Sequence, residues 1–436
     1  MFKNKRRFYL VLTMVIMAIS FLSGLIMVDG AGKQEIPKIP KVEVRIGMAP
    51  FGDQTWAIIG MKQGWFEEAG IIIDPKPYGK VIPSEQRTAV MIAGTVDIMT
   101  GHAGSLLPVL KDAPNLKFFF GSNTFLGFAI VARSDMGYKS YKEFLKEEKD
   151  PEKALDKTMA QLKGKVYAYA QIPANIAFVE QSLKKAGLSL DDVKSMVLED
   201  SKITAMMLTG RADFATTGAP SRMQLETKGY KPIFTAEDMA TMAKASPESD
   251  ELQGVLVAGL CTTDQFLKNN HDTVLRLCSV FYRIIDFMDK NQKDAIKLHL
   301  PYLNSVSGQN MTEKGLKFLY DSLNPFVTFE KQAPWYENPN DPFYYKNELG
   351  SKIRAWVEKG VYKQGEITEN SVTVAPQLYY EMKELKKKAE NVMAEVKSAK
   401  KFSHTTKDLL TKAEYYYKAY NYLDAVRFAE AAKKSL

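Results

Sequence analysis

The chain has 436 residues, of which 45% are hydrophobic and 25% are charged, a composition typical of globular rather than disordered or polytopic membrane proteins. The formal net charge is +8, but four cations precede residue 8 and residues 376–436 hold 13 Lys or Arg against 8 Asp or Glu, so the body between them is nearly neutral. The charge therefore gives no argument for nucleic-acid binding, and we expect no nucleic-acid partner.

An uninterrupted apolar run, Phe8–Val28, follows the four N-terminal cations. This arrangement predicts that residues 1–30 are either a secretory signal peptide or an N-terminal membrane anchor. The length favours an anchor, since about 20 residues span the hydrocarbon core, whereas small residues before Ala31 suit cleavage after Gly30. No cysteine follows the run, which excludes a lipid anchor. Either way the body lies outside the cytoplasm, secreted or anchored to the cell membrane by one helix, with residues 31–41 as a tether.

The body repeats one pattern of strands and helices twice. The first copy has strands at 42–48, 71–74 and 96–100, with helices at 56–68 and 83–93 between them. The second copy has strands at 165–170, 193–198 and 212–216, with a helix in each interval. Strand–helix alternation with short turns indicates a parallel sheet flanked by helices, so two copies predict two α/β lobes.

Glycines mark the same places in both copies. Gly70 and Gly94 end the helices of the first copy, and Gly187 and Gly210 end those of the second. The run 254–260 can return to the first sheet, and mostly helical sequence follows it. We therefore assign residues 42–133 and 255–375 to a discontinuous lobe I and residues 134–254 to lobe II, joined by hinge crossovers.

Residues 376–436 form a separate helical tail. This segment contains no glycine and is rich in Ala, Lys, Glu and Tyr. We expect a hairpin of two helices divided near residues 402–406, with Ser403 or Thr405 capping the second. The hairpin serves either to dock or space the protein, or simply packs on the body as a structural element. Its cationic surplus would also suit an anionic membrane or wall surface.

Several segments of the body resemble one known family. Their order and spacing are similar to those of the type II extracytoplasmic solute-binding proteins of ABC importers, in the branch that covers nitrate, sulfonate, taurine, bicarbonate and thiamine-precursor binders. The resemblance covers roughly residues 42–330 and implies a two-lobed fold of two doubly wound sheets. It also implies a binding protein rather than an enzyme, with an ABC permease and ATPase as partners. The segments are Ile46–Pro50, Gln63–Gly70, Ala93–Ile98, Leu162–Val166, Lys184–Leu188, Leu208–Asp213 and Thr263–Leu267.

The carboxyl ends of the strands are the predicted site. Ligands of open α/β sheets bind beyond these ends, and two facing sheets bring them to one cleft that also receives helix N-termini. The residues there are short, polar and nearly uncharged, which suits a small polar or anionic solute such as a sulfonate or nitrate. The predicted ligand-binding residues are Phe51, Gly52, Gln54, Thr55, Thr100, Gly101, His102, Asn123, Phe125, Gln171, Ala174, Asn175, Thr216 and Gly218.

Several side chains in or near this predicted site have an alternative structural role. His102 either donates to an anion or caps the next helix. Asp53 either pairs with a ligand amine or, as we prefer, caps a helix, and a bare anion becomes a poor ligand if Asp53 faces the pocket. Trp56 and Phe125 either stack on an organic ligand or, as we prefer, belong to the core. Asp97 and Asp213 are expected at strand starts, away from the cleft.

Two other functions compete with transport. A ligand-sensing or surface-assembly protein would use the same cleft to signal to a partner. An enzyme that resembles the thiamine-pyrimidine synthases would need a cysteine-rich motif, which this chain lacks, and no P-loop, HExxH or GxSxG motif stands out.

Metal and cofactor sites are not expected. The two cysteines, Cys261 and Cys278, form no CxxC pair, and no two of the four histidines lie at helical spacing. The two cysteines either form a disulfide or remain plain buried residues.

Overall fold

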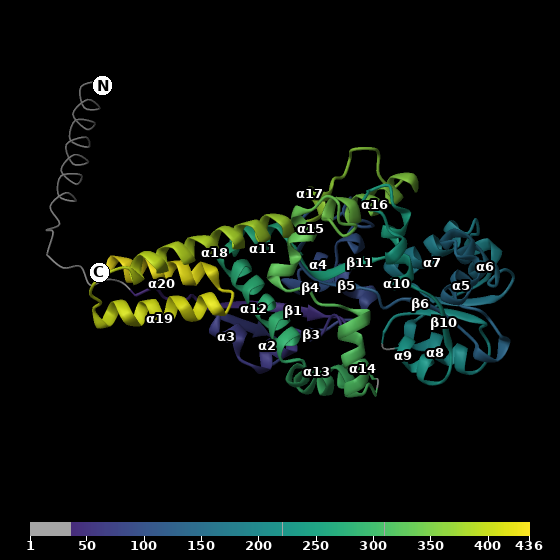
Figure 1. Ribbon diagram of the computed structural model, residues 1–436, viewed down its shortest axis with the longest axis horizontal. Coiled ribbons are helices and arrows are strands. Elements are labelled where there is room, and N and C mark those ends of the chain that lie inside the picture. Colours follow the sequence, from purple (N-terminus) through teal and green to yellow (C-terminus); the bar gives the residue numbers. More distant parts are fainter. Residues whose placement is uncertain (1–35, 220, 309) are drawn as a thin grey trace, which may run out of the picture.

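The computed structural model describes residues 36–219, 221–308 and 310–436, and it shows two α/β lobes followed by a helical bundle (Figure 1). The mixed α/β class with two sheets is therefore confirmed. The predicted signal peptide or anchor, residues 1–30, lies outside the described residues. Within the described ranges, no helix combines the length and the apolar character needed to cross a membrane.

The first sheet has six strands in the order β2-β1-β4-β11-β5, with β3 paired to β1. β1 is parallel to β2 and β4, whereas β11 is antiparallel to both β4 and β5. The strands are β1 (Val42–Met48), β2 (Ile71–Asp74), β3 (Lys80–Val81), β4 (Ile98–His102), β5 (Leu116–Phe125) and β11 (Leu256–Thr263). The helices of this first lobe are α2 (Ile58–Lys62), α3 (Trp65–Glu68), α4 (Arg87–Ile92), α11 (Asp264–Asn269), α12 (His271–Lys290), α13 (Gln292–Ser307), α14 (Glu313–Phe318), α15 (Ala333–Glu337), α16 (Tyr345–Glu358) and α17 (Glu369–Val372).

The second sheet has five strands in the order β10-β6-β9-β7-β8. β7 is parallel to β8 and β9, and β6 is antiparallel to β9 and β10. The strands are β6 (Ala129–Ala132), β7 (Val166–Ala170), β8 (Lys194–Leu198), β9 (Phe214–Thr217) and β10 (Lys231–Thr235). The helices of this second lobe are α5 (Tyr141–Glu148), α6 (Pro151–Ala160), α7 (Pro173–Lys185), α8 (Asp200–Leu208), α9 (Ser221–Thr227) and α10 (Ala236–Met242).

The predicted boundary of lobe I at residue 133 is wrong, because β6 belongs to the second sheet. Its residues pair with β9, for example Ala129 with Thr217. The chain therefore crosses between the lobes before residue 129. β5 and β6 are both buried along their whole length and only three residues separate them, so the sequence shows no linker where the crossover occurs.

A matched pair of aspartates supports the idea of a duplicated unit. The Asp97 carboxylate accepts the backbone N–H of Arg45 at 2.8 Å, and the Asp213 carboxylate accepts that of Val166 at 3.0 Å. Each aspartate thus ties the start of its own strand to the neighbouring parallel strand. This agrees with the expectation that both lie at strand starts.

The tail is a bundle of three helices rather than the predicted hairpin. We call α18 (Ala375–Lys397), α19 (His404–Lys418) and α20 (Tyr422–Lys434) the C-terminal bundle. The predicted second helix is divided because Tyr420 adopts a φ of 64°, a left-handed conformation that a helix cannot contain, and Asn421 then caps α20. Ser403 caps α19, as one of the two expected residues.

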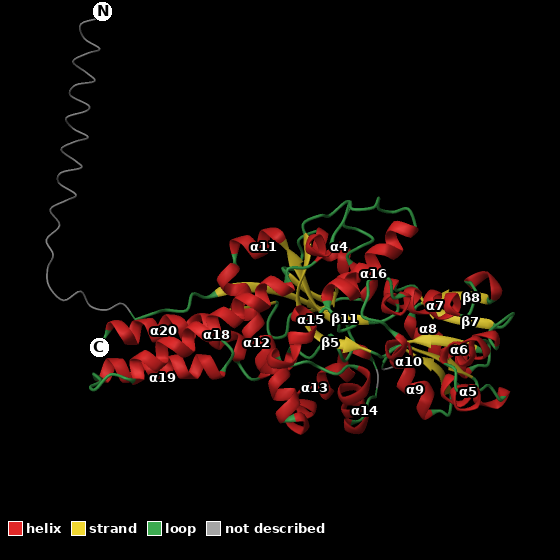
Figure 2. Cartoon of the chain, turned by 45° about the horizontal axis from the view of Figure 1, so that its top comes forward, coloured by secondary structure: helices red, strands yellow, loops and turns green. Residues whose placement is uncertain are grey.

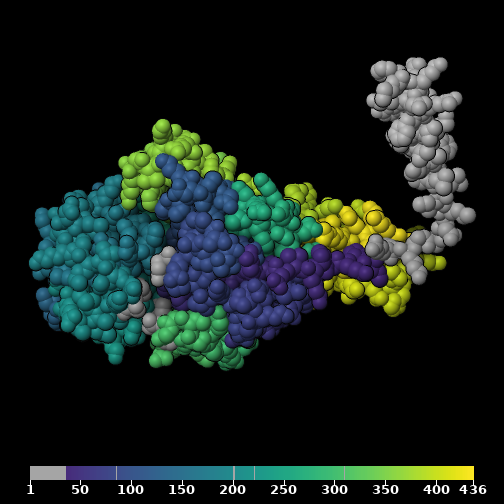
Figure 3. Space-filling model, turned by 180° about the vertical axis from the view of Figure 1, so that it is seen from behind, coloured from purple at the N-terminus to yellow at the C-terminus, as the bar shows by residue number. Residues whose placement is uncertain are grey.

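The bundle is fixed to the first lobe through a buried ion pair. Arg276 of α12 donates two hydrogen bonds to Asp424 of α20, at 2.8 and 3.0 Å, and the two side chains are 1% and 2% exposed. Figure 2 and the view from behind in Figure 3 place the bundle at one end of the molecule and the second lobe at the other.

Candidate functional site

A small pocket of about 60 Å³ lies between the two lobes. The segments after β1, β3 and β4 supply its walls from the first lobe, and those after β7 and β9 supply them from the second, as expected for the carboxyl ends of parallel strands. The crossover strands β5 and β11 close it. We call this the inter-lobe pocket, and its lining residues are Phe51, Asp53, Gln54, Ser84, Arg87, His102, Phe125, Phe128, Ile172, Ala174, Asn175, Gly218, Ala219, Leu256 and Ala258.

Half of the predicted residues lie in this lining, and both lobes contribute to them. They are Phe51, Gln54, His102, Phe125, Ala174, Asn175 and Gly218. Asn175 is held in place by its own contacts, because its Oδ1 accepts the backbone N–H of Ala170 at 3.2 Å. The ring of Phe125 packs edge-on against Phe128, with centroids 4.7 Å apart, so the two rings form one aromatic wall.

The other predicted residues lie outside the lining. The matched threonines hold the sheets together instead: Thr100 accepts the backbone N–H of Ala49 at 3.1 Å, and Thr216 is hydrogen-bonded to the Tyr167 hydroxyl. Asn123 accepts the hydroxyl of the adjacent Ser122 at 2.7 Å.

The remaining predicted positions face other parts of the chain. A Cβ at Gly52 would lie 2.7 Å from Leu319, so Gly52 faces the core of the first lobe, whereas one at Gly101 would lie 3.4 Å from Cys261 and 3.8 Å from Arg87, just behind the lining. Gln171 is exposed.

His102 combines the two roles that the sequence left open. Its Nδ1 accepts the backbone N–H of Ser105 at 3.1 Å, which caps the short turn of helix after β4. The proton of the neutral ring therefore lies on Nε2, which is left to donate to a ligand. Burial, together with the nearby cations Arg87 and Lys352, lowers the pKa of His102 well below its usual range. The ring is thus a neutral donor at physiological pH.

The preferred interpretation of Asp53 as a helix cap is wrong. α2 begins at Ile58 with Ala57 as its N-cap, while Asp53 lines the pocket and is 5% exposed as a residue. Gln54 donates to this carboxyl at 3.0 Å and in turn accepts from Arg87 at 3.2 Å. Burial raises the pKa of Asp53, although the Gln54 hydrogen bond and the Arg87 charge oppose the shift.

One polar atom in the lining has no partner. The Oγ of Ser84 is buried and makes no hydrogen bond with the residues that the structure describes. Ser84 lies next to Arg87 at the start of α4, and the Arg87 side chain donates to the Ser84 carbonyl at 3.2 Å. A buried hydroxyl without a partner costs free energy, so this atom is suited to bind a ligand.

Beneath the pocket, Thr55 and His299 hold the loop that carries Phe51 and Gln54. The Thr55 hydroxyl donates to the Phe51 carbonyl at 2.9 Å, so its oxygen accepts from His299 Nε2 at 2.7 Å. His299 Nδ1 then accepts from the Tyr320 hydroxyl at 2.5 Å. The ring is fully buried, and burial lowers the pKa of His299 to about 3.

The comparisons with known proteins address the fold. Residues 152–295 match the family described as NMT1/THI5 like. The periplasmic aliphatic sulphonate binding protein SsuA from Escherichia coli is 13% identical, with a TM-score of 0.51 over 76% of this chain and 91% of that chain. A putative sulfonate ABC transporter, periplasmic sulfonate-binding protein SsuA, from Methylobacillus flagellatus KT is 16% identical, with a TM-score of 0.52 over 80% and 96%. The chain has the fold of a type II periplasmic binding protein.

This periplasmic-binding-protein fold confirms the resemblance inferred from the sequence. The ligand binding component of an ABC-type import system from Staphylococcus aureus, solved with zinc bound, has a TM-score of 0.53 at 10% identity, over 78% of this chain and 99% of that chain. No curated protein matches the chain significantly. In the described part of this chain, no cluster of three or more His, Cys, Asp or Glu residues could hold a metal ion.

Several lining residues were missed from the sequence: Phe128, Ile172 and Ala219 are neighbours of predicted residues, and two further groups come from elsewhere. Ser84 and Arg87 follow β3, a strand of two residues that is too short to show alternation. Leu256 and Ala258 stand at the beginning of β11 rather than at a strand end. β11 is antiparallel, so its amino end meets the carboxyl ends of β4 and β5 at the pocket. An apolar run that returns to the first sheet is the signal that could have identified them.

Trp56 and the two cysteines lie in the core rather than in the pocket. Trp56 is 1% exposed and packs edge-on against Phe281 and Phe326, so it belongs to the core and does not stack on a ligand. Cys261 and Cys278 are free thiols, both buried, and burial raises the pKa of Cys261 to about 12.

Proposed function

We propose that the chain is the extracytoplasmic solute-binding subunit of an ABC importer, which captures a small polar or anionic solute in the inter-lobe pocket. The observation that supports this proposal most directly is that residues from both lobes line the inter-lobe pocket. Arg87, Ser84 and His102 come from the first lobe, and Asn175 and Gly218 from the second. A solute that contacts both sides at once favours the closed arrangement of the lobes, and this closed form is what a permease would recognise.

The polar groups of the pocket favour an organic solute with one hydrogen-bond acceptor group. The Nε2 of His102 and the unpartnered hydroxyl of Ser84 can donate to a sulfonate or carboxylate, and the Arg87 guanidinium adds a positive charge to the same lining. Asp53 lies in the same lining, and its carboxylate repels any anion, whereas nitrate has no apolar contact to offset that repulsion. A sulfonate or carboxylate bearing an organic group can also bury apolar surface against the rings of Phe125 and Phe128, so it fits the pocket better than nitrate.

A binding role is also favoured over catalysis. The thiols of Cys261 and Cys278 are buried, and Cys261 has its pKa raised to about 12, so neither is an available nucleophile. In this proposal the body acts outside the cytoplasm, with residues 1–30 as its signal peptide or membrane anchor and an ABC permease and ATPase as its partners.

Ligand-driven closure is the direct test. We expect methanesulfonate or benzenesulfonate to reduce the radius of gyration in solution scattering and to change the tryptophan fluorescence. His102→Asn keeps an acceptor for the Ser105 N–H but removes the Nε2 donor, so it should weaken binding at least about tenfold. Gln171→Ala is the matched control, since Gln171 is exposed and outside the lining, and its affinity should equal that of the wild type. No closure with sulfonates, carboxylates, amino acids or pyrimidines would refute the proposal.

A further inference from the structure

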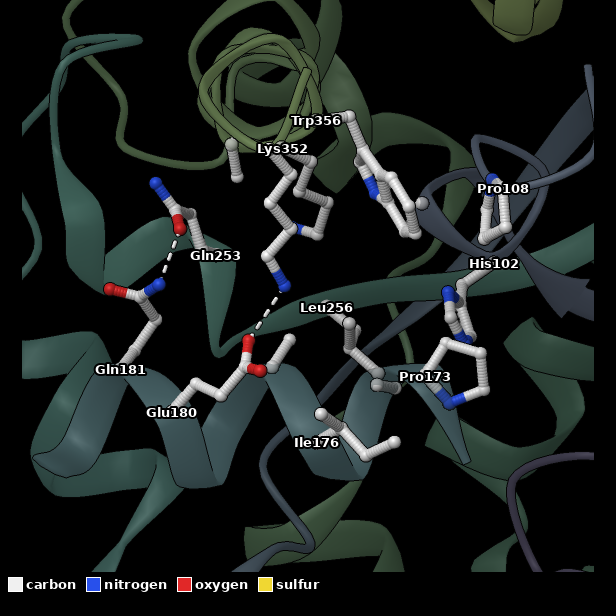
Figure 4. A pocket seen from close by; sticks show the side chains of 15 residues that line it. His102, Pro108, Pro173, Ile176, Glu180, Gln181, Gln253, Leu256, Lys352 and Trp356 are labelled. Carbon is white, nitrogen blue, oxygen red and sulfur yellow. Dashed lines mark hydrogen bonds and ion pairs between the residues drawn. The ribbon is translucent and has the colours of Figure 1, made fainter. Parts of the chain in front are cut away.

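A second, larger cavity adjoins the inter-lobe pocket. It measures about 240 Å³ and lies between α7 of the second lobe and α16, as Figure 4 shows. His102, Ala174 and Leu256 line both spaces, so these three residues form the boundary between them. We call this cavity the side chamber.

The walls of the side chamber are mostly apolar. Trp356 descends from α16, Ile176 rises from α7, and Leu256 lies between them on β11 (Figure 4). Pro108 and Pro173 add flat apolar faces at the His102 side. A cavity with such walls binds a compact apolar group better than it binds water.

The wall formed by α16 is held rigidly by a buried lysine. Lys352 donates to the carbonyls of Leu252 and Val255, at 2.6 and 2.8 Å, and to the carboxylate of Glu348 at 2.6 Å. The Lys352 side chain is 7% exposed, and these acceptors use all three of its protons. The chamber is therefore bounded by a fixed helix, and its lysine is not free to attract an anion.

The rim of the chamber is polar. Glu180 of α7 forms an ion pair with Lys359, just beyond α16, at 2.7 Å, and the Lys359 amine also lies 5.7 Å from the centre of the Trp356 ring. Gln181, also in the lining, donates to Gln253, and its own carbonyl oxygen is buried without a partner among the described residues. The charged and amide groups thus lie along one side of a space whose other walls are apolar.

We propose that the side chamber receives the apolar, preferably aromatic, group of the solute whose polar group occupies the inter-lobe pocket. The part of this inference that concerns the polar group rests on the proposed function. The shared boundary at His102, Ala174 and Leu256 allows one molecule to reach both spaces, and the inter-lobe pocket of about 60 Å³ is too small for more than a head group. The ligand class is then a sulfonate or carboxylate with a compact ring or short chain.

The test uses phenol, which has an aromatic ring but no anionic group, and the pair methanesulfonate and benzenesulfonate. Ala355 lines the chamber from α16, so Ala355→Phe should fill it. Ala160→Phe, at an exposed position on α6, is the matched control. In calorimetry, the wild type and the control should bind phenol equally, and Ala355→Phe should bind it at least about tenfold more weakly. Ala177→Leu fills the chamber from α7 if Ala355→Phe fails to fold.

The two sulfonates separate this inference from the proposed function. Benzenesulfonate should bind the wild type at least about tenfold more tightly than methanesulfonate does, and Ala355→Phe should remove that advantage while leaving methanesulfonate unchanged. The inference that the side chamber binds an apolar group is overturned if phenol does not bind, or if the filling variants bind phenol as well as the wild type does. If phenol binds as expected and no sulfonate, carboxylate, amino acid or pyrimidine binds, the chamber stands as an aromatic site and the proposed function fails.

Discussion

Acid should destabilise the protein through His299 by an amount that can be worked out from its surroundings. The ring lies between Thr55 and Tyr320, is fully buried, and burial lowers its pKa to about 3. In the unfolded chain the same ring has a pKa of about 6.5. Between these two values the unfolded state binds a proton that the folded state does not, so the free energy of unfolding falls as the pH falls.

The size of the effect follows from the distance below pH 6.5. At pH 4.5, about two pH units below the unfolded value, the loss is about 2.7 kcal/mol, and above about pH 6.5 the contribution is fully present. His102 also makes the protein less stable in acid, because its pKa is lowered too. This contribution is the same in the wild type and in a variant at position 299, so it cancels when the two are compared.

Urea unfolding of the wild type and of His299→Gln, each at pH 7.5 and pH 4.5, measures this contribution. The variant loses the ring and its proton, so it should be less stable at pH 7.5 but lose about 2.7 kcal/mol less than the wild type on going to pH 4.5. The loop that carries Phe51 depends on the same contacts, so sulfonate affinity should also fall at pH 7.5. Equal losses of stability with pH in the two proteins would refute the reasoning.

Two further predictions concern other charged groups. Because the pKa of Asp53 is raised, acid should neutralise its carboxyl and increase the affinity of the inter-lobe pocket for benzenesulfonate. The variant Asp53→Asn should bind benzenesulfonate more tightly than the wild type at neutral pH and show no increase in acid. Calorimetry between pH 5 and 8 measures both affinities, and a wild-type affinity that falls in acid contradicts this assignment. In the buried pair between Arg276 and Asp424, Asp424→Leu alone should lower the free energy of unfolding in urea by about 3–5 kcal/mol, because it leaves a buried charge without a partner. The double variant Arg276→Met, Asp424→Leu should recover most of that loss. Losses that simply add would show that the two residues are not coupled.

Much of the fold could be predicted because local signals and the global architecture agree. The glycines that end helices, such as Gly70 and Gly187, have positive φ angles of 75° and 67°, which only glycine adopts without strain. Their repeated spacing exposed the duplication. The crossover before β6 could not be located in this way, because only three residues separate two buried strands, whichever sheet each of them joins.

The candidate site could be predicted only in part, because the direction of a side chain depends on contacts with residues far away in the sequence. Strand ends identify a region, and His102 and Asn175 were found from it. Which of two polar residues at a strand end faces the pocket depends on side-chain partners that are distant in the sequence. Thr216 was expected in the site, yet its hydroxyl pairs with Tyr167, 49 positions away. Arg87 reaches the pocket from a helix whose preceding strand is only two residues long.

The attachment of the C-terminal bundle determines which half of the protein can swing. Arg276 and Asp424 join the bundle to the first lobe alone, at the end of the molecule away from the second lobe (Figure 2). Whatever the bundle rests on therefore immobilises the first lobe and its share of the pocket, including Arg87 and His102. If the lobes close around a solute, the second lobe is then the one that moves. Attaching the bundle to a solid support should therefore leave solute binding unchanged.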